Sequence, residues 1–141
     1  MAKTTAYSMI NVQATLDGIA VRGFWDGDDA MTVTVADVGE MLVGAGGDSI
    51  FSQSADQSAE ITIRLQHTSK THEQLVKKWK QQRAGRLNGF PFDFIDKDSG
   101  EGGTADKCFI SKAPDDQKGQ NATVREWTLV TGDYEPLTPN N

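Results

Sequence analysis

Two histidines are the first residues in this sequence that suggest metal chemistry. His67 and His72 lie five positions apart, whereas the paired histidines of a zinc helix lie four apart. No cysteine or second carboxylate is placed with them. Residues 96–100 begin like a calcium loop, but the glycine comes one position early and the closing glutamate is absent. We therefore expect no metal site and no cofactor.

Phosphate binding and catalysis lack support for similar reasons. The run of Gly44, Gly46 and Gly47 lacks the Gly-Lys-Ser/Thr ending of a phosphate loop. Cys108 lies beside Phe109 and has no motif that links it to a histidine and an acid, so we expect a structural cysteine. The sequence predicts a protein that is not an enzyme.

The composition indicates one small acidic domain over residues 1–141. Twenty acidic and fourteen basic side chains give a net charge of −6, which argues against a DNA-binding protein. No apolar run approaches the roughly 20 residues of a membrane span, and the first six residues lack the apolar core of a signal peptide. The charges form blocks of −7, +6 and −5 over residues 1–60, 61–90 and 91–141, so that one copy could complement another.

Alternating apolar and polar residues predict that the fold is mainly β. Residues 10–16 alternate in this way, and Asp17-Gly18 then predicts a two-residue turn into a return strand over 19–25. Further strands are expected at 31–35, 61–65, 90–96, 107–112 and 122–131.

Residues 36–56 predict a long hairpin arm with a glycine-rich tip, or a mobile loop. The six large apolar residues of this segment argue against simple disorder, because they require something to cover them. They are Val38, Met41, Leu42, Val43, Ile50 and Phe51.

One amphipathic helix is predicted over residues 72–84. Thr71 and Gln74 fit a capping box, Leu75 and Trp79 lie at helical spacing, and Gly85 is a suitable C-cap. The chain after residue 132 is predicted to be a loosely held tail over 133–141. Together these elements predict a β-sandwich or barrel-like domain with one flanking α-helix.

The order of these features resembles the tail tube proteins of contractile-tailed bacteriophages. The resemblance covers about residues 6–135 and is strongest in 6–70. It is carried by AYSMINVQATLDG at 6–18, GFWDGDD at 23–29, VGAGGD at 43–48, SQSADQSAEITI at 52–63 and LQHTS at 65–69. The glycine-rich arm that precedes a Ser/Asp-rich step into a strand is the most specific part.

This resemblance implies a structural virion protein assembled in the host cytoplasm. Proteins of this kind form hexameric rings that stack into the hollow inner tube of the tail, through which DNA passes transiently during ejection. The implied partners are other copies of the chain and the sheath, baseplate, tape-measure and tail terminator proteins, without stable membrane association.

The resemblance also assigns expected roles to residues. The inter-subunit arm would use Val38, Met41, Leu42, Val43, Gly44, Gly46, Gly47, Ile50 and Phe51. The candidates for the wet face toward the lumen are Asn11, Gln13, Thr15, Thr62, Arg64 and Gln66. The candidates for the outer, sheath-facing surface are Lys77, Lys78, Lys80 and Arg83.

A monomeric ligand-binding β-sandwich, such as a carbohydrate-binding module, is the alternative hypothesis. It would use Trp25, Trp79 and Trp127 as binding platforms. Trp79 lies on the apolar stripe of the predicted helix, and Trp127 shares a strand face with Leu129. Both positions favour a core role.

Overall fold

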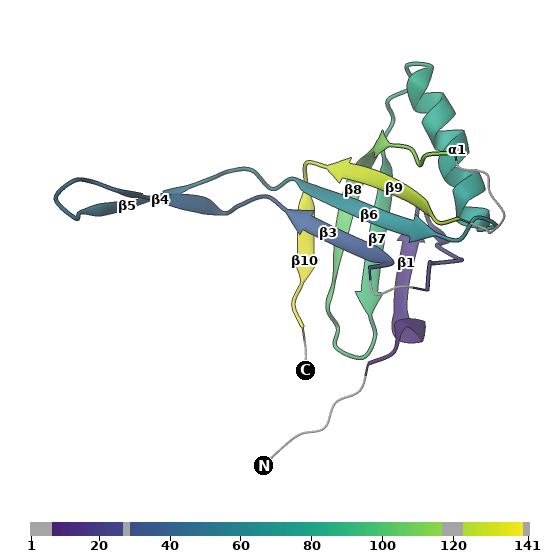
Figure 1. Cartoon of the computed structure of the whole chain (residues 1–141), viewed down its shortest axis with the longest axis horizontal. Coiled ribbons are helices and arrows are strands. Elements are labelled where there is room, and N and C mark those ends of the chain that lie inside the picture. The colour runs from purple at the N-terminus through teal and green to yellow at the C-terminus, as the bar shows by residue number, and fades with distance from the viewer. Residues whose placement is uncertain (1–6, 27–28, 117–122, 140–141) are drawn as a thin grey trace, which may run out of the picture.

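Antiparallel β-strands dominate the computed structural model, which describes residues 7–26, 29–116 and 123–139 (Figure 1). Within these residues, eight strands form one sheet, two form a separate hairpin, and one α-helix flanks them. The elements are η1 (Met9–Asn11), β1 (Val12–Leu16), β2 (Ile19–Ala20), β3 (Met31–Val35), β4 (Gly39–Val43), β5 (Ser49–Gln53), β6 (Ala59–Leu65), α1 (Lys70–Arg83), β7 (Phe90–Asp96), β8 (Gly102–Lys112), β9 (Arg125–Thr131) and β10 (Tyr134–Leu137). The predicted fold class, mainly β with a flanking helix, is confirmed.

The eight-stranded sheet folds over on itself into a sandwich. Its strand order is β2-β1-β7-β8-β9-β6-β3, and β10 pairs with β8 beside this path. The long strand β8 belongs to both layers, since residues 102–108 pair with β7 and residues 108–112 with β9. Figure 1 shows β3, β6 and β9 crossing over β1, β7 and β8. Within the described residues β2 and β3 end the strand order without pairing to each other, so the sandwich stays open.

The core lies between the two layers and follows the alternation of the sequence. Every second residue of β6 and β9 is buried, and β1 and β7 contribute from the opposite layer. The helix adds Leu75. The largest fully buried side chains are Trp127, Phe92, Leu16, Ile61, Ile63, Leu65, Leu75 and Leu129.

The strand after the first turn is shorter than the predicted 19–25. Asp17 and Gly18 adopt φ values of 53° and 80°, as the predicted turn requires. However, only Ile19–Ala20 form β2. The chain then leaves the sheet for the start of the helix, where the Arg22 amide donates to Thr71 Oγ1 at 2.9 Å. The Ser69 hydroxyl donates to the Arg22 carbonyl. The Val21 amide still donates to the Ala14 carbonyl of β1 at 2.9 Å, and beyond it the chain crosses to β6, where Phe24 pairs with Leu65.

The helix begins two residues before the predicted start. Ser69 is its N-cap, and Ser69 Oγ accepts a hydrogen bond from the Thr71 amide at 3.2 Å. The predicted capping box at Thr71 and Gln74 is therefore wrong, because Thr71 is a buried residue of the first turn and its hydroxyl accepts from Arg22. In the described part of the chain, no helix is long and apolar enough to cross a membrane.

Two boundaries near the C-terminus also differ from expectation. β8 begins at Gly102, five residues before the predicted 107, and Tyr134–Leu137 form a strand where the sequence predicted a loosely held tail over 133–141. β10 pairs with residues 102–105 of β8. A Cβ at Gly103 would meet the ring of Tyr134, so this glycine permits the close pairing. Residues 140–141 of the predicted tail lie outside the described residues.

Candidate assembly site

The segment expected to be an arm is a β-hairpin that projects from the sandwich (Figure 1). β4 and β5 pair from Gly39 opposite Gln53 to Val43 opposite Ser49 and form a sheet of their own. Of the two predicted alternatives for residues 36–56, a hairpin or a mobile loop, the structure has the hairpin. The turn is closed by a hydrogen bond from the Gly44 amide to the Asp48 carbonyl at 2.8 Å.

The apolar side chains of this hairpin are exposed. The exposed fraction lies between 51% and 69% for each of Val38, Met41, Leu42, Val43, Ile50 and Phe51. Single exposed apolar residues are ordinary, but a contiguous patch of them marks an interaction site. The geometry thus favours an assembly role for the predicted arm residues.

The pairing register gives the hairpin two chemically different faces. Directly opposite residues share a face, so Met41 and Phe51 lie together with Val43. Leu42 and Ile50 lie on the opposite face. The first face, formed by residues 39, 41, 43, 49, 51 and 53, carries no ionisable side chain, and we call it the neutral face. The second includes Glu40, and we call it the acidic face.

Gly39 is a residue of the arm that sequence reasoning missed. A Cβ at this position would meet the Ser52 carbonyl oxygen and the ring of Phe51. Gly39 therefore permits the Phe51 ring to lie across the base of the neutral face. Its place inside a strand, apart from the glycine-rich tip, was the available signal.

The predicted lumen-facing residues fall into two groups on different layers. Gln13 and Thr15 lie on the outer face of β1, whereas Thr62 and Arg64 lie on the outer face of β6. Because β1 and β6 bury their other faces in the same core from opposite layers, these two polar faces point in opposite directions. Asn11 lies in η1, where Asn11 Nδ2 donates to both carboxylate oxygens of Asp98, and Gln66 follows β6.

The layer of β3, β6 and β9 presents a regular polar surface. Thr62 is directly opposite Thr32 on β3 and Thr128 on β9, which makes a row of hydroxyl side chains across three strands. Beside this row, Arg64 Nε lies 3.1 Å from Glu126 Oε2, and Arg64 Nη1 donates to the Asp29 carbonyl at 2.7 Å. These contacts hold the Arg64 side chain between β9 and the segment that precedes β3.

The basic helix residues do not share one environment. Lys77, Lys80 and Arg83 are exposed, and Arg83 Cζ also lies 5.1 Å from the centre of the Trp79 ring. Lys78 is half-buried, with Nζ 2.6 Å from Asp17 Oδ2 and 5.1 Å from the centre of the Phe90 ring. Lys78 therefore attaches the helix to the β1–β2 turn, and three of the four predicted outer cations remain exposed.

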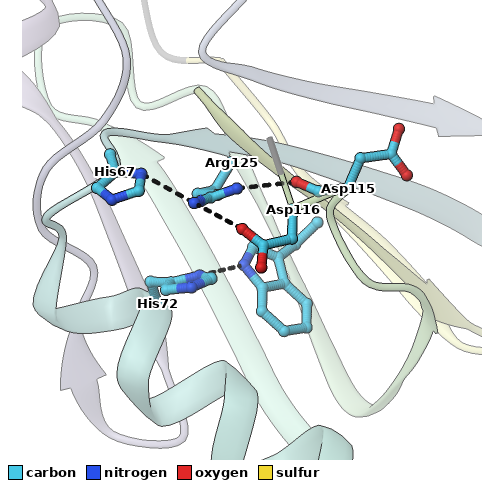
Figure 2. A network of polar contacts seen from close by, with 6 residues as sticks. His67, His72, Asp115, Asp116 and Arg125 are labelled. Atoms are coloured by element: carbon cyan, nitrogen blue, oxygen red, sulfur yellow. Dashed lines mark hydrogen bonds and ion pairs between the residues drawn. The ribbon is translucent and has the colours of Figure 1, made fainter. Parts of the chain in front are cut away.

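A polar network joins the start of the helix to β9 (Figure 2). The buried Arg125 donates to His67 Nδ1 at 2.9 Å and to the Asp115 carbonyl at 2.8 Å, and its Nη2 lies 3.4 Å from Asp116 Oδ1. Trp127 Nε1 donates to His72 Nδ1 at 3.1 Å. Both histidines thus bind neighbouring side chains, and the network ties four separate chain segments together. Among the described residues, no three His, Cys, Asp or Glu side chains are grouped so that they could hold a metal ion.

The tryptophans offer no shared platform for a ligand. Trp127 is fully buried, and Trp79 packs against it edge to face with ring centres 6.3 Å apart. Of the three, Trp25 is the one with substantial exposure. The alternative of a carbohydrate-binding module therefore loses two of its three candidate residues.

Comparisons with known proteins agree with this architecture. One similar chain comes from the cryo-EM structure of the sheath/tube terminator, in the extended state, of the PVC extracellular contractile injection system. It is 11% identical to this chain with a TM-score of 0.66, and the match covers 96% of this chain and 99% of that one. A chain of the PVC sheath-tube complex is 12% identical with a TM-score of 0.62, covering 93% and 90%. A chain of the native gene transfer agent particle is 15% identical with a TM-score of 0.63, covering 96% and 100%. At these identities the likeness shows a shared fold.

No curated protein matches the chain. A family comparison does, since the family described as bacteriophage PhiTE tail tube protein matches residues 4–137. That match spans the sandwich, the helix and the arm. The chain therefore belongs to the tail tube protein family of bacteriophage PhiTE.

Proposed function

We propose that this protein is a structural virion protein whose hexameric rings stack into the hollow inner tube of a contractile phage tail. The tube would serve as the conduit for DNA during ejection, and the chain would have no enzymatic activity. Assembly would take place in the host cytoplasm before the protein becomes part of the tail. Membership of the tail tube family and the tube-like fold support this proposal.

The observation that carries the proposal is the exposed apolar arm. Burial of each large apolar side chain contributes roughly 1.5–3 kcal/mol, so six of them on one hairpin are a strong drive toward association. The arm projects from the body of its own subunit (Figure 1), so its natural target is another subunit. Contacts of this head-to-tail kind generate rings or stacked assemblies.

The free edge of β3 suggests how a ring closes. β3 pairs only with β6 among the described strands, and its sequence Met-Thr-Val-Thr-Val contains neither proline nor charge. Soluble monomers usually protect such an edge. By contrast β2 has two residues and β10 contains Pro136, features typical of edges that remain free. We propose that β3 continues into the neighbouring subunit, which makes the layer of β3, β6 and β9 the wall of the lumen.

The polar face of this layer suits a wet channel. It would present the threonine row to the lumen, with Thr62 and Arg64 from the predicted set, whereas Gln13 and Thr15 would face the other side. The net charge of −6 per subunit limits adhesion of DNA, because like charges repel.

The exposed cations of α1 are proposed to contact the surrounding sheath. Lys77, Lys80 and Arg83 are accessible, and a surface pair that is weak on its own repeats around a ring. The chains with this fold in the sheath-tube and terminator structures support sheath and tail terminator as partners. Baseplate and tape-measure proteins complete the proposed partner set.

Electron microscopy and analytical ultracentrifugation of concentrated protein test this function. We expect six-membered rings or tubes with a central channel. If the protein alone stays monomeric, baseplate or terminator protein is added as a nucleus for assembly. A monomer that persists at high concentration with such a nucleus present would contradict the proposal.

A further inference from the structure

An apolar groove lies at the root of the arm, where the two layers of the sandwich part. Its volume is about 800 Å³, and β3, β7 and β10 supply its walls. The apolar lining includes Met31, Val33, Val35, Phe94, Tyr134 and Leu137. The groove is therefore a continuation of the core that the subunit itself does not fill.

The rim of this groove is acidic. Asp56, Glu101 and Glu135 line it, and no lysine or arginine does so among the described residues. An occupant must be apolar enough for the floor, and a negatively charged occupant would be repelled by the rim. The chemistry of the groove thus favours an apolar segment that carries no acidic side chain.

We infer that the groove receives the neutral face of the arm of a second copy, an assignment that rests on the proposed tube function. The neutral face offers Met41, Val43 and Phe51 without an ionisable side chain, which matches the apolar floor. The acidic face would bring Glu40 against the acidic rim.

The occupant must come from another molecule. Val35, Ala36 and Val38 at the root of the arm line the groove, and from there the hairpin runs away from the body (Figure 1). A hairpin that starts at the groove and extends outward cannot place its own β4–β5 strands inside it. The same arm and groove on every copy make a contact that repeats from subunit to subunit.

Disulfide trapping tests the contact directly. Phe51→Cys with Leu137→Cys places one thiol on the neutral face and one in the groove, and the native Cys108 is fully buried. Ile50→Cys with Leu137→Cys is the matched control, because Ile50 is the adjacent residue on the acidic face. Under mild oxidation at tube-forming concentration, we expect a ladder of covalent oligomers from the first variant and at least about tenfold less from the control.

Paired substitutions give a second readout. Met41→Ser with Phe51→Ser should raise the protein concentration needed for tubes at least about a hundredfold, because two large apolar side chains lose their burial. Oxidation carried out in 1 M salt should give at least as much ladder as oxidation at low salt, since docking relies on apolar contact near like charges. If the arm instead docked on the basic helix, salt would reduce the amount of ladder. That outcome would overturn the assignment of the arm to the groove.

The outcomes separate this inference from the tube function. Tubes without a ladder from the Phe51–Leu137 pair, or with an equal ladder from the control, overturn the groove assignment alone. A ladder without tubes supports the groove contact and counts against the tube function. If neither a ladder nor tubes form when a nucleus is present, the result counts against both the groove contact and the tube function.

Discussion

At the scale of single residues, the buried Cys108 shows how the core changes the acidity of a side chain. It lies on β8 inside the sandwich, and burial raises the pKa of its thiol to about 11, although a hydrogen bond with Thr131 opposes this. The thiol is thus neutral at ordinary pH and protected from reagents. A nucleophilic cysteine would need the opposite shift, so the structural role predicted from sequence fits this environment.

The raised thiol pKa predicts a loss of stability at alkaline pH. The pKa of the thiol in the folded protein exceeds its ordinary value of 9.0. The contribution of the neutral, buried thiol to the unfolding free energy is therefore fully present below pH 9 and is lost as pH rises toward 11. We expect the wild type to lose about 2 kcal/mol more unfolding free energy than Cys108→Ala between pH 8 and pH 10.5. Urea denaturation of both proteins at both pH values measures this difference. Equal losses would show that the thiol does not titrate in the core.

At the scale of elements, the arm depends on close packing inside its own hairpin. Gly39→Ala would push a methyl group against the Ser52 carbonyl and the Phe51 ring, so the base of the hairpin must distort. We expect loss of tubes, while the thermal midpoint of the monomer changes by less than about 2 °C, because the arm lies outside the core. Gly46→Ala is the matched control, since nothing lies within 4 Å of its Cβ position. Equal effects of the two substitutions would contradict this packing argument.

Substitutions on the helix can distinguish cations that contact the sheath from a cation that stabilises the subunit. Replacement of Lys77, Lys80 and Arg83 by Gln should reduce sheath attachment, because these side chains are exposed. It should lower the unfolding free energy by no more than about 2 kcal/mol, through the lost cations of the last helical turn and the lost contact of Arg83 with the Trp79 ring. Lys78→Glu should instead destabilise the monomer, since it replaces the ion pair with Asp17 by a repulsion. Sheath co-sedimentation and denaturant unfolding measure the two effects. Normal sheath binding by the triple variant would exclude this face as the contact.

Elements with a clear local pattern were predictable, and those set by distant contacts were not. Alternation located β3, β6 and β7, and Asp17-Gly18 located the first turn. The strand predicted over 107–112 in fact begins at Gly102, because Gly102 and Gly103 have no side chain and so let β7 and Tyr134 approach closely. The apolar arm was visible in sequence, whereas its two faces depend on register and the groove on three strands far apart in the chain.

At the scale of the whole molecule, the sandwich has two polar outer faces, and only one can line a tube. The layer of β3, β6 and β9 ends in the unprotected edge of β3, which a neighbour can extend. The opposite layer ends in the two-residue strand β2 and in β10, which contains Pro136. A continuous barrel across subunits would require a free edge of useful length, and this requirement supports the proposal that the first layer lines the lumen.

Cysteine labelling of assembled tubes tests this choice of layer. Thr32 and Gln13 are exposed residues on the two opposite outer faces, one on β3 and one on β1. In dispersed subunits, Thr32→Cys and Gln13→Cys should react with a bulky maleimide polymer at similar rates, with little background from the buried Cys108. In long tubes with closed ends, the reaction of Thr32→Cys should fall at least about tenfold, because the polymer cannot enter the channel, whereas Gln13→Cys should keep most of its rate.

A small maleimide that fits the channel should still label Thr32→Cys, which distinguishes a residue in the lumen from a residue in a buried contact. Protection of Gln13→Cys in place of Thr32→Cys would reverse the sandwich in the tube wall and move the lumen to the face of β1.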